Sequence, residues 1–370
     1  MTKTLDAIHS LTIEQKIGQL FFIGIPGPNI DNLTRKLIAG VLPGGVCLFA
    51  RNIKEAEQTR KLLDNLRELL PIEPFLSVDQ EGGLVDRLRR IITPMPAANK
   101  IRTQQDAAEL GRLVAEALRL LGLNMDFAPV VDVIDDSRAS ISNGLFSRTF
   151  GRSPEEVVEL AGAFLSTLES GGCLGCLKHF PGLGASVVDS HEELPNVNIS
   201  QAEFEAKDLF PYTKILSAGS PSAVMVAHAA YPKLDLQEVD QNAKLLPSSL
   251  SKNVVSGLLR GRFGFDRLVV TDDLEMGAIL KNYGIGEACK MAIAAGVDVL
   301  AICAEVDSIY EGFNALSAAV AAGEISEERL EESLRRIAIA KSKLSEPLVF
   351  DQARLDSLSN RISEINVRLN

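Results

Sequence analysis

Eight short apolar runs recur along the chain, and nearly all of them are separated by amphipathic stretches with helical spacing. Within the runs, apolar and polar positions do not alternate, which is typical of parallel strands buried on both faces. The expected strands lie within Leu20–Ile25, Gly45–Ala50, Pro74–Val78, Leu123–Val133, Cys173–Phe180, Ala223–Ala227, Leu268–Thr271 and Val297–Cys303. Eight strand–helix units in 370 residues favour an α/β fold of the (β/α)8 barrel type over a doubly wound sheet.

The amphipathic stretches predict the helices that cover these strands. They lie within Thr12–Lys16, Asn29–Ala39, Glu55–Leu70, Glu109–Leu121, Ser153–Ser170, Glu203–Leu216, Ser248–Leu259 and Gly286–Ala295, and two more reach about Leu344. Ser153 is expected to be an N-cap, with Glu156 at the capping-box position. Residues 345–370 are expected to form a terminal helix packed on the outside of one catalytic domain that spans residues 1–370.

The composition of the chain limits the kinds of molecule that it is expected to bind and the compartment in which it is expected to act. A net charge of −11 argues against nucleic-acid and anionic-membrane partners, which would need a basic surface. No apolar stretch approaches the roughly 18 residues of a membrane-spanning helix, and Met1–Gln19 has no apolar region typical of a secretory signal. Five cysteines, mostly inside apolar runs, favour reduced thiols and a cytoplasmic location. The sequence leaves the oligomeric state open, a monomer included.

Polar residues gather where the apolar runs stop. These residues are Asp79, Asp126, Asp132, Lys178, His179, His228, Asp272 and Asp273. In a barrel the carboxyl ends of the strands converge on one face, where active sites form. Some of these side chains could instead cap helices, Asp132 and Asp273 above all, but capping is a poor account of all eight.

The stretch from Lys178 to His191 is the richest in ionisable groups. Lys178 and His179 end a strand, a turn containing glycine follows, and the loop beyond it carries Asp189 and His191. We expect that loop to be hinged at Gly182 and Gly184. No His-x-His or His-Glu-x-x-His motif is present, and Lys178 beside His179 would repel a cation, so we expect neither a metal nor another cofactor.

These residue types suit a neutral substrate rich in hydroxyl groups. Asp79, Arg87, Arg148 and the Lys178–His179 pair could bracket several hydroxyls with carboxylates and cations. A further carboxylate, supplied by Asp272, could attack or stabilise an anomeric centre.

Four motifs carry a resemblance to a known family. They are Val-Asp-Gln-Glu-Gly-Gly at 78–83, Ser-Arg-Thr-Phe-Gly at 147–151, the stretch 178–191, and Thr-Asp-Asp-Leu-Glu-Met at 271–276. Together, over about residues 12 to 340, the chain resembles glycoside hydrolase family 3, in particular its single-domain β-N-acetylglucosaminidases. The resemblance implies a (β/α)8 barrel and a retaining mechanism through a glycosyl-enzyme. It also implies that Asp272 is the nucleophile rather than Asp273, a choice that strand-end position alone leaves open.

The resemblance also assigns the remaining roles. His191 would be the general acid/base and Asp189 would orient it, whereas larger β-glucosidases of the family take this group from an additional domain. Asp79, Arg87, Arg148, Lys178 and His179 would hold the sugar. The expected activity is release of terminal β-linked N-acetylglucosamine from peptidoglycan fragments. The alternatives are a β-N-acetylglucosaminide phosphorylase, a family 3 β-glucosidase or xylosidase, and an inactive sugar-binding barrel.

Overall fold

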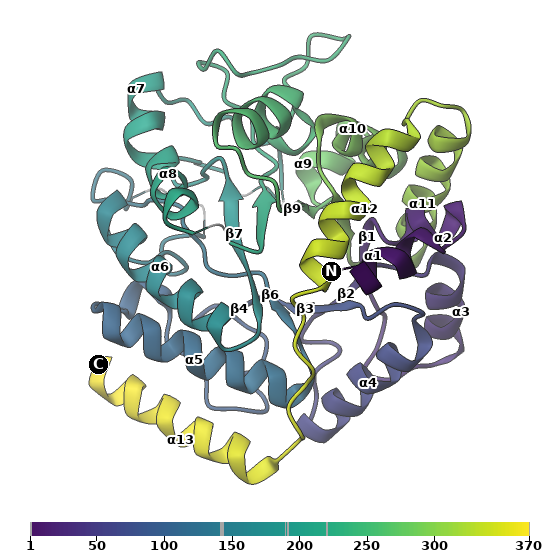
Figure 1. The fold of residues 1–370 in the computed structure, drawn as a ribbon. Coiled ribbons are helices and arrows are strands. Elements are labelled where there is room, and N and C mark those ends of the chain that lie inside the picture. Colours follow the sequence, from purple (N-terminus) through teal and green to yellow (C-terminus); the bar gives the residue numbers. More distant parts are fainter. Residues whose placement is uncertain (1, 141–143, 189, 191, 220, 370) are drawn as a thin grey trace.

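Eight parallel strands close into a barrel in the computed structural model, which describes residues 2–140, 144–188, 190, 192–219 and 221–369 (Figure 1). The strands are β1 (Phe21–Gly24), β2 (Gly45–Leu48), β3 (Phe75–Val78), β6 (Met125–Asp126), β7 (Leu174–Phe180), β8 (Ala223–Val226), β9 (Leu268–Asp273) and β10 (Val299–Ile302). Around the barrel they follow chain order, and β10 pairs with β1 to close it. The predicted (β/α)8 architecture is confirmed, and each expected apolar run corresponds to one strand, although β9 continues two residues past the expected end at Thr271.

Aromatic side chains fill the interior of the barrel. The Phe22 ring lies 5.5 Å from that of Phe75 and 5.3 Å from that of Phe127, measured between centroids. Gly45 makes room for this cluster, because a Cβ atom there would lie 2.3 Å from the Phe22 ring. A barrel filled in this way is a packed core rather than a pore, so a ligand site has to lie at one of its ends.

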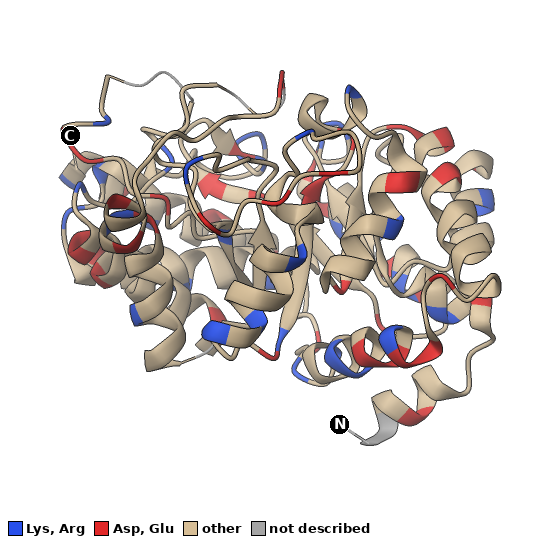
Figure 2. Ribbon diagram, turned by 90° about the horizontal axis from the view of Figure 1, so that it is seen from above, with Lys and Arg blue, Asp and Glu red and all other residues tan. Residues whose placement is uncertain are grey.

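Helices surround the strands (Figure 1). They are α1 (Thr2–His9), α2 (Ile13–Gly18), α3 (Asn32–Val41), α4 (Ala56–Leu69), α5 (Gln104–Leu121), α6 (Pro154–Ser170), α7 (Gln201–Glu203), α8 (Leu209–Ala218), α9 (Gly277–Leu280), α10 (Ile285–Ala295), α11 (Val306–Ala321), α12 (Glu327–Lys341) and α13 (Gln352–Leu369), with π-helical turns at Phe204–Asp208 and Asn253–Arg262. In the described part of the chain, no helix combines the length and the apolar character needed to cross a membrane. Acidic and basic residues are interspersed on the helices seen from above (Figure 2).

Two local details differ from the expectation. Ser153 caps α6 by accepting a hydrogen bond from the Glu156 amide, as predicted, but the Glu156 carboxylate accepts from the Arg152 amide, one residue before the cap. The long apolar run around β6 forms only a two-residue strand, and the chain beyond it stays beside β7 through an isolated bridge between Val130 and Lys178. Asp132 therefore lies near the carboxyl end of β7, which carries Lys178 and His179.

A short antiparallel hairpin, which the sequence pattern did not predict, follows β3. Its strands are β4 (Gln80–Gly82) and β5 (Val85–Asp86). The amide of Met95 donates to the Asp86 carboxylate at 2.8 Å and so ties the segment after the hairpin to the hairpin itself. Because Glu81 lies on β4, this support fixes one wall of the site described below.

The C-terminal helix α13 packs against α5 through four buried side chains, those of Leu355, Leu358, Ile362 and Ile365. Ion pairs flank this apolar seam, including Arg354 with Glu116 at 2.5 Å and Arg368 with Asp106 at 2.6 Å. The helix also supports the segment after the hairpin, since the Ser359 hydroxyl accepts a hydrogen bond from the Thr93 amide at 2.9 Å.

Candidate active site

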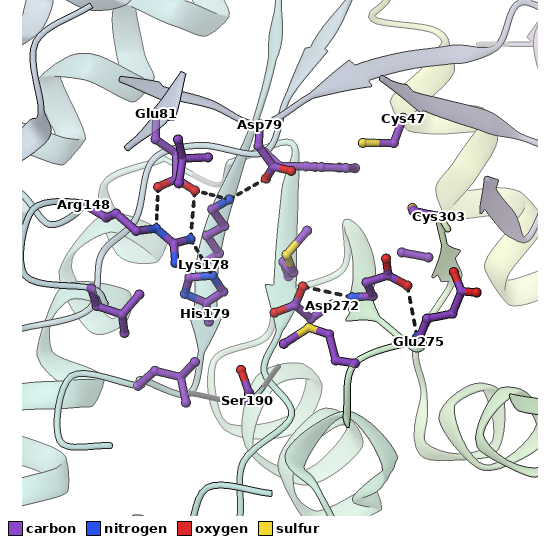
Figure 3. A pocket seen from close by; sticks show the side chains of 18 of the residues that line it. Cys47, Asp79, Glu81, Arg148, Lys178, His179, Ser190, Asp272, Glu275 and Cys303 are labelled. Carbon is purple, nitrogen blue, oxygen red and sulfur yellow. Dashed lines mark hydrogen bonds and ion pairs between the residues drawn. The ribbon is translucent and has the colours of Figure 1, made fainter. Parts of the chain in front are cut away.

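A cavity of about 320 Å³ opens at the carboxyl ends of the barrel strands (Figure 3). Six of the eight residues given a catalytic or sugar-binding role from the sequence line it, namely Asp79, Arg87, Arg148, Lys178, His179 and Asp272. Strands β7 and β9 supply Lys178, His179 and Asp272 directly, and Asp79 follows β3. The volume is at the small end of the range for ligand sites, which suits one compact group such as a single sugar ring.

The other two singled-out residues, Asp189 and His191, lie outside the described residues. Their described neighbours Val188 and Ser190 both line the cavity. The Ser190 carbonyl accepts a hydrogen bond from the Ala278 amide at 3.2 Å, which ties this part of the chain to α9. The segment that follows β7 therefore borders the cavity through the residues that the structure describes.

The two glycines of that segment lie where the chain is tightly packed. The Gly182 carbonyl accepts a hydrogen bond from the Tyr231 hydroxyl at 2.5 Å, and its φ of +131° favours glycine. A Cβ atom at Gly184 would lie 2.0 Å from the Val133 carbonyl oxygen. The positive φ explains the glycine at 182, and the close approach of the Val133 backbone explains the glycine at 184.

Lys178 is the centre of a buried network of charges. Its Nζ atom lies 2.7 Å from Asp79 Oδ1 and 2.5 Å from Glu81 Oε1, and the side chain is only 2% exposed. The guanidinium of Arg148 makes two hydrogen bonds to the Glu81 carboxylate, at 2.7 and 2.9 Å. Two cations thus face two carboxylates, and this balance allows all four groups to remain charged away from water.

The same balance shifts the pKa values in this network. Burial alone would raise the pKa of Glu81, but the charges of Lys178 and Arg148 outweigh burial and lower it to about 2. Burial alone would lower the pKa of Lys178, but the carboxylates of Asp79 and Glu81 hold it above its usual value. Lys178 is therefore a permanently charged donor at neutral pH.

His179 lies between Asp132 and Arg148. Its Nδ1 atom is 2.7 Å from Asp132 Oδ2, and its Nε2 atom is 3.4 Å from a terminal nitrogen of Arg148. The other oxygen of Asp132 accepts a hydrogen bond from the Leu183 amide at 2.6 Å. Asp132 is thus the partner of an imidazole in the cavity wall, and not the helix cap considered from its sequence position.

The neighbouring carboxyl groups of Asp272 and Asp273 differ in their charge state. Burial would raise the pKa of Asp272, but the nearby His179 and His228, together with the Asp273 amide and Lys178, lower it. Burial, opposed in part by the Glu275 amide, raises the pKa of Asp273 to about 7, and the charges of Glu275 and Asp272 raise it further. At neutral pH, Asp272 is consequently the ionised carboxylate of the pair, as a nucleophile must be.

His228 supports the strand end that carries Asp272. It is fully buried, its Nε2 atom lies 3.1 Å from the Asp273 carbonyl oxygen, and its Nδ1 atom lies 2.7 Å from Ser249 Oγ. The carbonyl requires a donor, so Nε2 carries the proton and Nδ1 accepts from the Ser249 hydroxyl. This residue therefore acts on the backbone of β9.

Sequence reasoning missed the role of Glu81, which binds both cations of the network. A signal was present, because Asp79 and Glu81 are two residues apart on an extended chain and therefore point the same way. Among the described residues, no group of three or more His, Cys, Asp or Glu side chains is arranged to hold a metal ion.

Comparison with known proteins decides the family. The model of the glycosyl hydrolase family 3 N-terminal domain matches residues 12–340. A β-hexosaminidase of Tolumonas auensis is 35% identical over 286 residues, which cover 76% of this chain and 81% of that protein. A β-hexosaminidase of Pseudomonas aeruginosa is 36% identical over 267 residues, covering 70% of this chain and 75% of that protein. The chain belongs to glycoside hydrolase family 3.

A solved structure agrees with this family 3 assignment. A family 3 β-N-acetylglucosaminidase from Paenibacillus sp. FPU-7 superposes with a TM-score of 0.83 at 34% identity, covering 96% of this chain and 69% of that one. The matched residues 12–340 include all eight barrel strands and the six cavity residues named above. The chain is therefore a glycoside hydrolase, as its motifs predicted.

Proposed function

We propose that this family 3 enzyme releases terminal β-linked N-acetylglucosamine with retention of configuration, through a covalent intermediate on Asp272. One observation carries the proposal: an ionised, half-buried carboxylate faces a sugar-sized cavity whose opposite wall holds Lys178, His179 and Arg148 (Figure 3). The similar proteins named as β-hexosaminidases and as a β-N-acetylglucosaminidase support the choice of sugar.

In the first step, an oxygen of Asp272 bonds to the anomeric carbon as the bond to the aglycone oxygen breaks. The aglycone oxygen takes a proton as it leaves, and water then attacks the same carbon and returns Asp272 to its ionised form. Asp79, Arg87, Arg148, Lys178 and His179 would hold the hydroxyl groups of the sugar. Charged hydrogen bonds of this kind discriminate strongly, because a substrate lacking the hydroxyl leaves them unpaired.

His191 is the proposed general acid/base, with Asp189 as the group that orients it. This assignment rests on the family resemblance and on the position of Val188 and Ser190 in the cavity wall. An imidazole suits both steps, since its ordinary pKa of about 6.5 lets it donate and accept a proton near neutral pH.

The substrate and the nucleophile can be tested together. Hydrolysis of p-nitrophenyl glycosides of N-acetylglucosamine, glucose and xylose, with and without phosphate, should show turnover of the first and no dependence on phosphate. Asp272→Ala should lower kcat by at least about 10⁴-fold, because it removes the proposed nucleophile. A 5-fluoro glycosyl inactivator should label Asp272 in the wild-type protein. Label on Asp273 or a sugar 1-phosphate product would contradict the proposal.

The acid/base assignment has its own test. His191→Ala should lose several orders of magnitude on disaccharides but much less in glycosylation by dinitrophenyl N-acetylglucosaminide, whose leaving group needs no proton. Azide, which needs no base, should restore turnover and give the β-glycosyl azide. Asp189→Ala should show the same pattern more weakly. A uniform loss across leaving groups without azide rescue would remove His191 from this role.

We further propose that residues 1–370 act as one catalytic domain in the cytoplasm, on fragments of peptidoglycan. The five cysteines support a reducing compartment, because all five are buried and none forms a disulfide bond with another. The packing of α13 on α5 supports the single domain, since the terminal helix shares its apolar face with the barrel.

A further inference from the structure

Asp132 is fully buried, and each of its carboxylate oxygens has one hydrogen-bond partner. Oδ2 lies 2.7 Å from His179 Nδ1, and Oδ1 accepts from the Leu183 amide at 2.6 Å. The backbone amide fixes the rotation of the carboxylate, so Oδ2 has a defined position against the imidazole. The Val131 amide donates to the Lys178 carbonyl at 2.8 Å, which holds the chain before Asp132 beside the strand that carries His179.

The two neighbours of His179 determine which ring nitrogen carries the proton. An ionised carboxylate only accepts hydrogen bonds, so Nδ1 beside Asp132 must be the donor. A guanidinium only donates, so Nε2 beside Arg148 must offer its lone pair. The imidazole is therefore held as the Nδ1–H tautomer, with an acceptor nitrogen on the side of the cavity wall that Arg148 shares. A sugar hydroxyl can donate to this nitrogen in place of Arg148, whose contact with it is long at 3.4 Å.

We propose that Asp132 is a positioning residue of the active site, which acts by fixing the ring orientation and tautomer of His179. The proposal rests on the proposed function in one respect, namely that His179 contacts the sugar. The carboxylate does not touch the substrate itself. Such partners of a functional histidine commonly contribute about 10- to 100-fold to the function of the ring that they orient.

Asp132→Asn is the sharpest variant, because it keeps the shape of the side chain. The amide oxygen can still accept from Leu183, but the amide nitrogen then faces His179 Nδ1 as a second donor. The ring has to change tautomer, and its Nε2–H then opposes the guanidinium of Arg148. We expect kcat/KM to fall about 10- to 100-fold, and by a similar factor for p-nitrophenyl and dinitrophenyl N-acetylglucosaminides, because His179 meets the sugar rather than the leaving group.

Asp126→Asn is the matched control. Asp126 is also a fully buried aspartate, at the end of β6, and its Oδ1 accepts from the Gln80 amide at 2.9 Å. Burial raises the pKa of Asp126 well above its usual value, and among the described residues its Oδ2 has no hydrogen-bond partner. Asparagine keeps the oxygen that accepts from the Gln80 amide and disturbs no other hydrogen bond of the described residues, so kcat/KM should stay within about threefold, well inside 1 kcal/mol.

Imidazole ¹⁵N spectra give a readout that does not depend on turnover. The chain has only four histidines, and a His179→Gln spectrum identifies the signal of this ring. The wild-type protein should show His179 as Nδ1–H and the Asp132→Asn protein as Nε2–H. A wild-type Nε2–H tautomer, or equal kinetics for the two asparagine variants, would overturn the role of Asp132. If Asp132→Asn changes the tautomer but the wild-type protein cleaves no N-acetylglucosaminide, the role of Asp132 is upheld and the proposed function is refuted.

Discussion

Two buried lysines lie at opposite ends of the barrel, and their pKa values are shifted in opposite directions. Lys178, at the carboxyl ends of the strands, binds Asp79 and Glu81, and these carboxylates keep its pKa above the usual value. Lys341, on α12, donates to the Gln19 side chain at 3.0 Å and lies 5.2 Å from the centroid of the Phe75 ring. Burial lowers the pKa of Lys341 to about 7, and Glu73 opposes this only in part.

The difference lies in the neighbours, since both side chains are almost inaccessible to water. An amide oxygen and an aromatic face do not repay the loss of hydration of an ammonium group, whereas two carboxylates do. The buried lysine at the carboxyl ends of the strands, Lys178, is thus a fixed charge available to a ligand. The buried lysine at the amino ends of the strands is largely a packing residue, whose pKa falls to about 7.

Lys178→Met should show the largest difference between the two ends of the barrel, in both stability and activity. It leaves Asp79 and Glu81 buried with Arg148 as the remaining cation, and breaking one side of a buried pair costs about 3–5 kcal/mol of unfolding free energy. We expect kcat/KM to fall at least about 100-fold as well, since the sugar hydroxyls lose a charged donor. Urea unfolding and kinetics on p-nitrophenyl N-acetylglucosaminide measure both effects. Wild-type values for both would make Lys178 equivalent to Lys341.

Glu81→Gln should have a smaller effect, mainly visible in acid. The pKa of Glu81 is about 2 in the fold and near its ordinary 4.5 in the unfolded chain. Its contribution to stability is therefore present above about pH 4.5 and is lost as the pH falls toward 2. The unfolding free energy of the variant should be lower than that of wild type at pH 7 and should fall less steeply between pH 4.5 and 2.

Glu205→Gln is the control for that measurement. Glu205 also makes a two-bond pair with an arginine, Arg262, at 2.6 Å for each bond, but the pair lies near the surface. Exposed pairs contribute about 0–1 kcal/mol, so this variant should stay close to wild type at pH 7 and keep full activity. An equal loss in the two variants would show that burial does not strengthen the Glu81 network.

Lys341→Met should have the smallest effect on activity, with kcat/KM within about twofold of wild type, well inside 1 kcal/mol. Its effect appears in the dependence of stability on pH. Because the pKa of Lys341 falls from 10.5 to about 7 on folding, the unfolded chain binds an extra proton between these values. Lys341 should therefore make the unfolding free energy of the wild type rise with pH between about 7 and 10.5, and the variant should lack this rise. An unchanged slope would mean that Lys341 keeps its charge in the fold.

The barrel was predictable because each strand is a continuous apolar run, and eight such runs separated by helices have few other arrangements. The residues after the runs followed from the same rule, which gave Asp79, Lys178, His179 and Asp272. The pairing of Lys178 with Glu81 was not predictable in the same way. It depends on a two-strand hairpin that closes over the barrel end, and on Arg148, which lies on a loop without a periodic pattern.

The position of Asp132 shows the same limit. The apolar run Leu123–Val133 predicts one continuous strand, but β6 ends at Asp126 and the chain beyond it follows β7 through an isolated bridge between Val130 and Lys178. The difference in pKa between Asp272 and Asp273 likewise depends on the three-dimensional arrangement, because the groups that lower the pKa of Asp272 come from β7 and from the chain after β8.

Closure of the barrel has a consequence for synthesis of the chain on the ribosome. Strand β1 pairs on one side with β2, but its other partner is β10, and the paired residues Phe21 and Leu300 are about 280 residues apart. At ordinary translation rates of about 5–20 residues per second, the open edge of β1 waits roughly 15–55 s for its neighbour. An unpaired apolar edge is a template for association with other chains. The nascent polypeptide should therefore depend on chaperones that shield its first strand until the last one emerges.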